Sequence, residues 1–285
     1  MNELTKEINA LLHLIDDPDE LVFQTVSDRL VGYGDKVVSI LDEYLETTEE
    51  EISKNRVLHI MDQIAINTLH ESIDSWKNDE ESSFLEISMI ITQLTSKSFN
   101  RNLLLFELEK IRKSIWLELN DFLTPLEVVN IFNKVIFDHF KFSSIEIDKN
   151  KGHHYSLVQL IELKEGNSYP LASIYLIMSE MLGLGIYPAD VYKQNLLCYF
   201  EENAHLSDTQ TGDILFYLDP SNGQVYTHND IENYYKKIGH HSPADAIAVS
   251  EKKSFTRRWL IDYAKTLEKG SWKQQQLISI ADELI

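Results

Sequence analysis

Cysteine is almost absent from this sequence: Cys198 is the only one among 285 residues. A single thiol cannot form an internal disulfide or a cysteine-rich zinc site. Long apolar runs are missing too, since no stretch approaches the roughly 20 residues that a membrane-spanning helix needs. The first residues lack the basic segment and following apolar segment of a signal peptide. We therefore expect a cytoplasmic protein.

Positive charge is also scarce. The chain has 26 Lys and Arg residues against 46 Asp and Glu residues, for a formal net charge of -20. This excess repels nucleic-acid phosphates and anionic membranes, because both need cationic neutralisation. We expect neither nucleic acid nor a membrane as a partner. Solubility is the simplest role of so acidic a surface, and an acidic face for a basic partner is the alternative.

Nucleotide and metal motifs are missing as well. Gly183-Leu184-Gly185 lacks the third glycine of a dinucleotide fingerprint and follows a helical stretch, and the sequence contains no phosphate loop. His153-His154 and His240-His241 are adjacent pairs, whose rings diverge on either a helix or a strand. No Cys or Glu cluster at ligand spacing supports either pair. We expect no metal and no cofactor.

Residues 1–122 have the pattern of successive helices. Apolar side chains recur at helical spacing in residues 3–15 and again in later segments. Asp16-Asp17-Pro18-Asp19 separates the first two helices, because a residue before proline is biased away from helix. Paired helices joined by a short acidic turn are typical of HEAT repeats, although the later turns diverge from the first. We predict an irregular, HEAT-like array with a core of leucine and isoleucine side chains.

Two helices stand out in the next part of the chain. The first begins with a capping box in Thr124-Pro125-Leu126-Glu127 and ends near His139. The second begins around Pro170, just after Gly166-Asn167-Ser168. Proline suits a first helical turn because its missing N–H would have no partner there. This second helix is apolar and is predicted to run to residue 184.

Two β-rich segments follow this helix. We predict one strand over Tyr187–Phe200 and a second over Ile214–Asp219. Asn222-Gly223 predicts a two-residue hairpin turn, because both residues tolerate positive φ. These segments indicate a small antiparallel sheet.

The last residues predict a helical hairpin. Ser254–Glu268 is amphipathic, Gly270 ends this helix, and Ser271 caps a final one. The sequence therefore predicts a predominantly helical α+β protein with three domains: a helical array at 1–122, a core at 123–250 and a helical hairpin at 251–285.

The order of several short motifs resembles bacterial transglutaminase-like proteins of the SirB group. The matching pieces are Thr124–Val129, Asn133–Phe137, Tyr155–Leu157, Gly166–Ser173, Leu182–Leu184, Asp219–Gly223 and Arg257–Leu260. The resemblance implies a papain-like or transglutaminase-like core with a small antiparallel sheet, placed between helical N-terminal and C-terminal regions. It also implies a role in regulation, since this group is linked to the control of gene expression.

Catalysis on such a core uses a cysteine thiolate at a helix N-terminus, whose dipole lowers the thiol pKa. A histidine serves as base and a carboxylate orients it. By the resemblance, the cysteine position falls in Pro170–Ser173, and the Gly-His-Phe of the next strand is replaced by Gln194-Asn195-Leu196. Asn195 cannot act as a general base at neutral pH. Asp219 alone matches its expected role, which argues against thiol chemistry and favours a protein that is not an enzyme.

The candidate residues of this degenerate site are Ser173, Asn195 and Asp219, and each also has a structural interpretation. Ser173 is a hydroxyl near a helix N-terminus that caps or packs. Cys198 is a small buried hydrophobe on the strand face opposite Asn195. Asp219 precedes Pro220 and is typical of a turn. Candidates for lining a binding cleft are Tyr169, Pro170, Tyr192 and Cys198.

Our leading hypothesis is a non-catalytic core that acts as a binding or regulatory module for a protein partner. One alternative is a hydrolase or acyl transferase that uses Ser173 or Cys198 together with Asp219. A histidine from elsewhere in the chain would favour that alternative, and the candidates are His154, His205 and His228. Another alternative is a helical-repeat adaptor whose core is only structural.

Overall fold

A computed structural model describes residues 3–79, 82–95, 100–145, 151–200, 214–239 and 249–284. The chain forms two compact units, Met1–Ser75 and Trp76–Ile285. The domain limits expected at residues 122 and 250 stay a prediction. Within the described ranges, no helix is both long enough and apolar enough to cross a bilayer.

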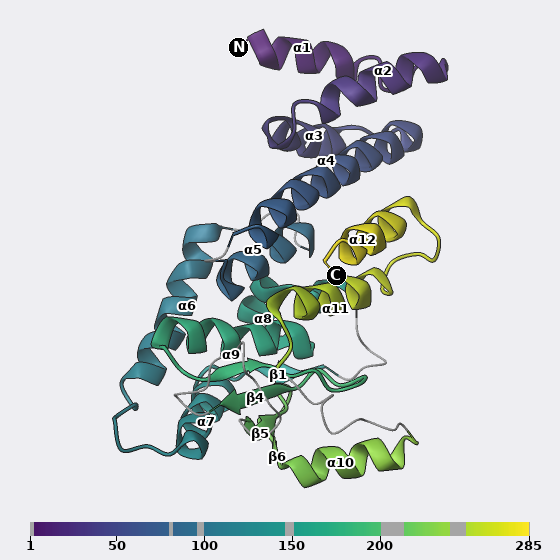
Figure 1. The fold of residues 1–285 in the computed structure, drawn as a ribbon. Helices are drawn as coiled ribbons and strands as arrows, with labels where there is room; N and C mark the ends of the chain where they lie inside the picture. The colour runs from purple at the N-terminus through teal and green to yellow at the C-terminus, as the bar shows by residue number, and fades with distance from the viewer. Residues whose placement is uncertain are drawn as a thin grey trace. The chain divides into compact units, whose positions relative to one another are not determined.

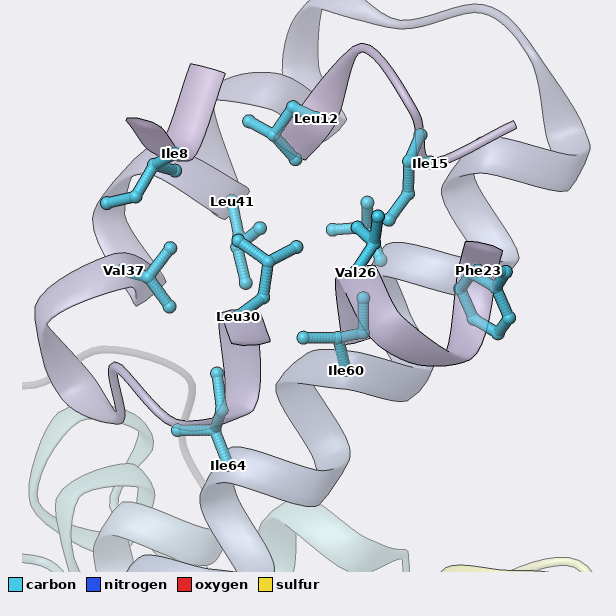
Figure 2. Packing of buried hydrophobic residues seen from close by; sticks show 11 residues of the cluster. Ile8, Leu12, Ile15, Phe23, Val26, Leu30, Val37, Leu41, Ile60 and Ile64 are labelled. Atoms are coloured by element: carbon cyan, nitrogen blue, oxygen red, sulfur yellow. The ribbon is translucent and has the colours of Figure 1, made fainter. Parts of the chain in front are cut away.

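The first unit is made of helices. They are α1 (Glu3–Leu12), α2 (Glu20–Val31), α3 (Asp35–Thr47) and α4 (Glu51–Lys77), and α4 contains the boundary between the two units. Figure 2 shows apolar side chains from all four helices pointing toward one another, among them Ile8, Leu30, Leu41 and Ile60. These four side chains are fully buried, as the helical spacing predicts.

The acidic turn before α2 is held in two ways. Asp19 caps the helix, because its carboxylate accepts a hydrogen bond from the N–H of Leu21 at 2.9 Å. Arg56 of α4 donates to the carbonyl oxygens of Ile15 and Asp17, each at 2.8 Å. The predicted interruption between the first two helices is therefore confirmed. The HEAT-like arrangement of these helices stays a prediction.

The second unit surrounds small sheets with helices. Its helices are α5 (Phe84–Thr95), α6 (Arg101–Trp116), α7 (Pro125–Asn133), the π-helix η1 (Lys134–His139), the 3-10 helix η3 (Gly152–Tyr155), α8 (Leu157–Leu163), α9 (Ser168–Leu182), α10 (His228–Lys237), α11 (Lys252–Ala264) and α12 (Trp272–Asp282). The predicted capping box of α7 is confirmed, since Thr124 and Glu127 bond to each other's backbone N–H. Helices α11 and α12 lie side by side as a hairpin (Figure 1).

The main sheet is antiparallel and its strands follow chain order: β3 (Ile186–Pro188), β4 (Leu197–Phe200), β5 (Ile214–Leu218) and β6 (Val225–Tyr226). A separate parallel pair joins β1 (Ser143–Ser144) to β2 (Glu165–Gly166). Helix α9 lies on one side of the main sheet and α10 on the other (Figure 1). On the α10 side, Cys198, Tyr217, Ile231 and Tyr235 belong to one buried cluster.

The prediction of one strand over Tyr187–Phe200 is wrong, because the segment is a hairpin. The N–H of Ala189 donates to the carbonyl of Leu196 at 2.9 Å, and Lys193 has a left-handed φ of 56°. Lysine carries no turn signal, and both arms of the hairpin are rich in β-forming residues. The amino-acid composition of Tyr187–Phe200 is therefore typical of one continuous strand.

The predicted two-residue turn at Asn222-Gly223 is also wrong. The loop spans Pro220–Gly223, because the N–H of Asp219 pairs with the carbonyl of Gln224 at 2.9 Å. Gly223 has a φ of 73°, whereas Asn222 is not among the residues with positive φ. The carboxylate of Asp219 accepts from the N–H of Ser221 at 2.8 Å, and this Asx turn starts the reversal earlier in the chain.

One amide side chain ties this loop to the helices. The Tyr175 hydroxyl of α9 donates to Asn133 Oδ1 at 2.6 Å, and Asn133 Nδ2 donates to the carbonyl of Gly223 at 2.8 Å. A Cβ at position 223 would lie 2.6 Å from Asn133 Cγ. Only glycine therefore fits beneath this amide, and the loop that carries Asp219 is fixed to α7 and α9.

Replacing Gly223 by alanine tests this close approach. We expect G223A to lower the free energy of unfolding by about 2 kcal/mol, because the new Cβ meets Asn133 and the backbone has positive φ. Urea unfolding followed by tryptophan fluorescence measures the change in the second unit, which contains all four tryptophans. In the G223A/N133A double variant the clash disappears, so the two effects should fall short of additive by about 1 kcal/mol.

Gly183 provides the matched control. Its φ is 67°, but a Cβ there would meet nothing within 4 Å. G183A should therefore lower the free energy of unfolding only through the strained backbone conformation at position 183. This loss should add to that of N133A. Additive behaviour of G223A and N133A would contradict the proposed close contact.

Candidate functional site

The start of α9 is the position where catalysis on a transglutaminase-like core would be organised. Asn167 caps the helix by accepting a hydrogen bond from the N–H of Tyr169 at 2.9 Å, and its own N–H donates to the carbonyl of His154 at 3.0 Å. Ser168 is then the first helical residue. Its half-buried hydroxyl stands where the positive end of the helix dipole acts.

Ser168 and Asn195 are brought together by the fold. Asn195 Nδ2 donates to Ser168 Oγ at 3.0 Å, across from the β3–β4 hairpin to the helix. Asn195 Oδ1 is buried and has no hydrogen-bond partner among the residues that the structure describes. Sequence reasoning singled out Asn195 but missed Ser168. The available signal was the cap itself, since an asparagine at the N-cap places the next residue at the first helical position.

Ser173 lies one turn further along α9 and is fully buried. Its hydroxyl donates to the carbonyl of Tyr169 in the same helix at 3.0 Å. This bond to the fourth preceding residue is common for serine inside helices. The geometry gives Ser173 a packing role within α9.

Cys198 lies in β4 on the α10 side of the sheet and is fully buried. Its Sγ is 3.5 Å from the carbonyl oxygen of Tyr187 and 3.7 Å from that of Pro188. Burial raises the pKa of the Cys198 thiol far above its ordinary value. A thiol in this environment remains protonated and is a poor nucleophile.

Asp219 holds the β5–β6 loop through both carboxylate oxygens. Oδ1 accepts from the N–H of Ser221 at 2.8 Å, and Oδ2 accepts from Asn222 Nδ2 at 3.3 Å. Burial and then the charge of Asp219 raise the pKa of Tyr175, and burial, Asp219 and Asp230 raise the pKa of Tyr226. The carboxylate is half-buried, so it serves the turn and also reaches the solvent.

The predicted cleft residues occupy different environments. Tyr169 is buried among aromatic rings, and its hydroxyl donates to Asp262 Oδ2 at 2.7 Å. Pro170 is buried in the first turn of α9. Tyr192 is 43% exposed at the tip of the β3–β4 hairpin, where its carbonyl accepts from the Tyr234 hydroxyl at 3.0 Å. Tyr192 alone among these three presents a ring to the solvent.

The histidines proposed as rescuing bases lie elsewhere or outside the described residues. His154 Nδ1 accepts from the N–H of Lys151 at 2.9 Å, and burial lowers the pKa of this imidazole. His228 packs its ring 5.3 Å from that of Tyr217. His205 and the His240-His241 pair fall outside the described residues. Among the described residues, no histidine hydrogen-bonds to Ser168, Asn195 or Asp219.

The described part of the chain also contains no group of three or more His, Cys, Asp or Glu side chains suited to a metal ion. Among the described residues, the polar pair at the start of α9 is a hydroxyl beside an amide. An amide does not accept a proton from serine at neutral pH.

Comparison with known proteins adds one match. The sequence model of the transglutaminase-like superfamily matches residues 104–260, which is more than half of the chain. The matched range includes Asn133, Ser168, Asn195 and Asp219, and so covers the start of α9, the β3–β4 hairpin and the β5–β6 loop. Comparison with curated proteins and with solved structures finds no match to the chain. The chain belongs to the transglutaminase-like superfamily.

Proposed function

We propose that this chain is a non-catalytic member of the transglutaminase-like superfamily whose core binds a protein partner in a regulatory role. The observation that supports this proposal is the pairing at the start of α9, where Ser168 faces Asn195 at 3.0 Å. By the resemblance, the cysteine position falls in Pro170–Ser173 and the histidine position at Asn195, so neither residue of thiol catalysis stands at its expected place. The chain's single thiol, Cys198, is buried on the other side of the sheet.

The rate contributions of a general base and of a thiolate nucleophile are large, and their loss argues against residual catalysis. A positioned general base contributes about 10²–10⁴-fold to a rate, and Asn195 cannot supply this contribution. A serine hydroxyl without a base is almost entirely protonated at neutral pH, so the helix dipole has no thiolate to stabilise. Asp219 remains, with one hydrogen bond from the β5–β6 loop at each oxygen and none from a described histidine.

The finer features of the proposal follow from the resemblance to bacterial proteins of the SirB group. We propose a cytoplasmic regulator with domains at 1–122, 123–250 and 251–285, in which the partner docks on the core or on the HEAT-like helical array. The net charge of -20 supports a protein partner over nucleic acid or an anionic membrane.

The proposal predicts that Ser168 is not a nucleophile. We expect the purified full-length chain to remain unlabelled at Ser168 by a fluorophosphonate probe, with labelled peptides read out by mass spectrometry. Hydrolysis of p-nitrophenyl acetate should be equal for the native chain and S168A. Probe labelling at Ser168 together with ester hydrolysis that S168A abolishes would establish a serine hydrolase and overturn the proposal.

The alternative in which Cys198 is the nucleophile has its own test. Because this thiol is buried and its pKa is raised, its reaction with Ellman's reagent should be at least about 100-fold slower in the folded chain than in guanidinium chloride. The unfolded chain is the control, since the same thiol is then exposed. Rapid, complete reaction of the folded chain would show an accessible thiol and would support the enzyme alternative.

The scaffold at the start of α9 should still favour a thiolate. In S168C the helix dipole should lower the pKa of the new thiol below the ordinary value of about 8.5, and S168C/N195H should lower it further, because a protonated imidazole stabilises the thiolate. The pH dependence of alkylation by iodoacetamide measures this pKa.

S114C is the control, since half-buried Ser114 lies near the opposite end of a helix, α6. Equal thiol pKa values for S168C and S114C would show that the start of α9 does not favour a thiolate.

A further inference from the structure

A cavity of about 460 Å³ lies between the β3–β4 hairpin, β6 and α10. This volume is within the range of small-ligand sites. Its apolar lining includes Val191 and Leu196 of the hairpin and Ile231 of α10. Two carboxylates, Asp219 and Asp230, also line it. An apolar floor beside two carboxylates differs from the start of α9, where Ser168 faces Asn195.

Both carboxylates have acceptor capacity beyond their structural bonds. Asp219 accepts one hydrogen bond at each oxygen, and a carboxylate offers about four acceptor positions. Asp230 caps α10 through Oδ2, which accepts from the N–H and the hydroxyl of Thr227 at 2.8 and 2.7 Å. The two charges also contribute, after burial, to the raised pKa of Tyr226, which lines the same cavity.

Tyrosine rings form another part of the wall. Tyr226 and Tyr234 both line the cavity, and the Tyr234 hydroxyl is fixed because it donates to the carbonyl of Tyr192 at 3.0 Å. Electron-rich ring faces attract cations, and a guanidinium stacks on them. The cation among the described lining residues is Lys237, in the exposed last turn of α10, where its ammonium reaches the solvent.

We propose that this cavity receives an arginine side chain presented by a partner protein. The aliphatic part of the arginine packs on Val191, Leu196 and Ile231, and the guanidinium pairs with Asp219 beside the tyrosine rings. Arginine fits better than lysine, because its planar group both stacks on an aromatic ring and bonds a carboxylate through two N–H groups. This inference rests on the proposed function and adds that the partner contacts the cavity through an arginine side chain. The chain's net charge of -20 would steer a basic partner toward it.

Nuclear magnetic resonance of the full-length, ¹⁵N-labelled chain tests the inference. The probes are acetyl-Gly-Arg-Gly-amide and its uncharged match acetyl-Gly-Gln-Gly-amide. We expect the arginine peptide to shift the amide signals of Leu196, Tyr226 and Ile231 with a Kd on the order of 1 mM, and the glutamine peptide to leave them unchanged. The corresponding lysine peptide should bind several-fold more weakly.

Two variants of the lining give opposite expectations. D219N removes the charge but keeps an oxygen for the N–H of Ser221, so the loop is retained and the Kd should rise about tenfold. K237Q removes the competing cation, so the Kd should fall. D219N loses the 3.3 Å hydrogen bond from Asn222 Nδ2, so its melting temperature should fall slightly, whereas K237Q should match the native chain. Cooperative thermal unfolding of both variants separates a charge effect from misfolding.

Failure of the inference and failure of the proposed function give different results. The inference is overturned by the absence of shifts up to about 20 mM peptide, or by an equal response to the glutamine or lysine peptide. An unchanged Kd in D219N, with that variant folded, also overturns it. Binding of the peptide followed by its hydrolysis or covalent capture would instead overturn the non-catalytic function and leave the cavity assignment standing.

Discussion

The amide of Asn133 is the contact on which the arrangement of the core depends. It accepts from Tyr175 of α9 and donates to the carbonyl of Gly223, so one side chain joins α7, α9 and the β5–β6 loop. Asn133 is the last residue of α7, and the chain continues from it into the π-helix η1. Because Asp219 begins the same loop, its position relative to α9 follows from this amide.

Local signals were enough to predict several elements of the fold. The capping box of Thr124 and Glu127 and the interruption before α2 depend on residues within four positions of one another, and both are confirmed. The two wrong predictions have different causes. Lys193 adopts a left-handed conformation without any residue type that announces it, and the Asx turn of Asp219 replaces the expected turn at Asn222-Gly223.

The candidate site depends on contacts between residues far apart in the sequence, which local signals do not predict. Asn195 and Asp219 were identifiable because the resemblance places them at known positions of a catalytic core. The pairing of Asn195 with Ser168 spans 27 residues and depends on how the β3–β4 hairpin turns back toward α9. The strand predicted over this segment contained no hairpin, so no argument from alternation along it was able to place Asn195 beside Ser168.

Asn195 Oδ1 has no hydrogen-bond partner within the described part of the chain, and in this the site differs from an ordinary core. A buried acceptor without a partner costs about 1–3 kcal/mol, which an apolar side chain of similar size would avoid. Here the polar pair remains at the start of α9 while the loop of Asp219 is held by three separate hydrogen bonds, from Ser221, Asn222 and Asn133. The fold thus holds a polar pair beside an anchored carboxylate in this part of the superfamily domain, in place of an apolar packing that would avoid the cost of the buried Asn195 oxygen.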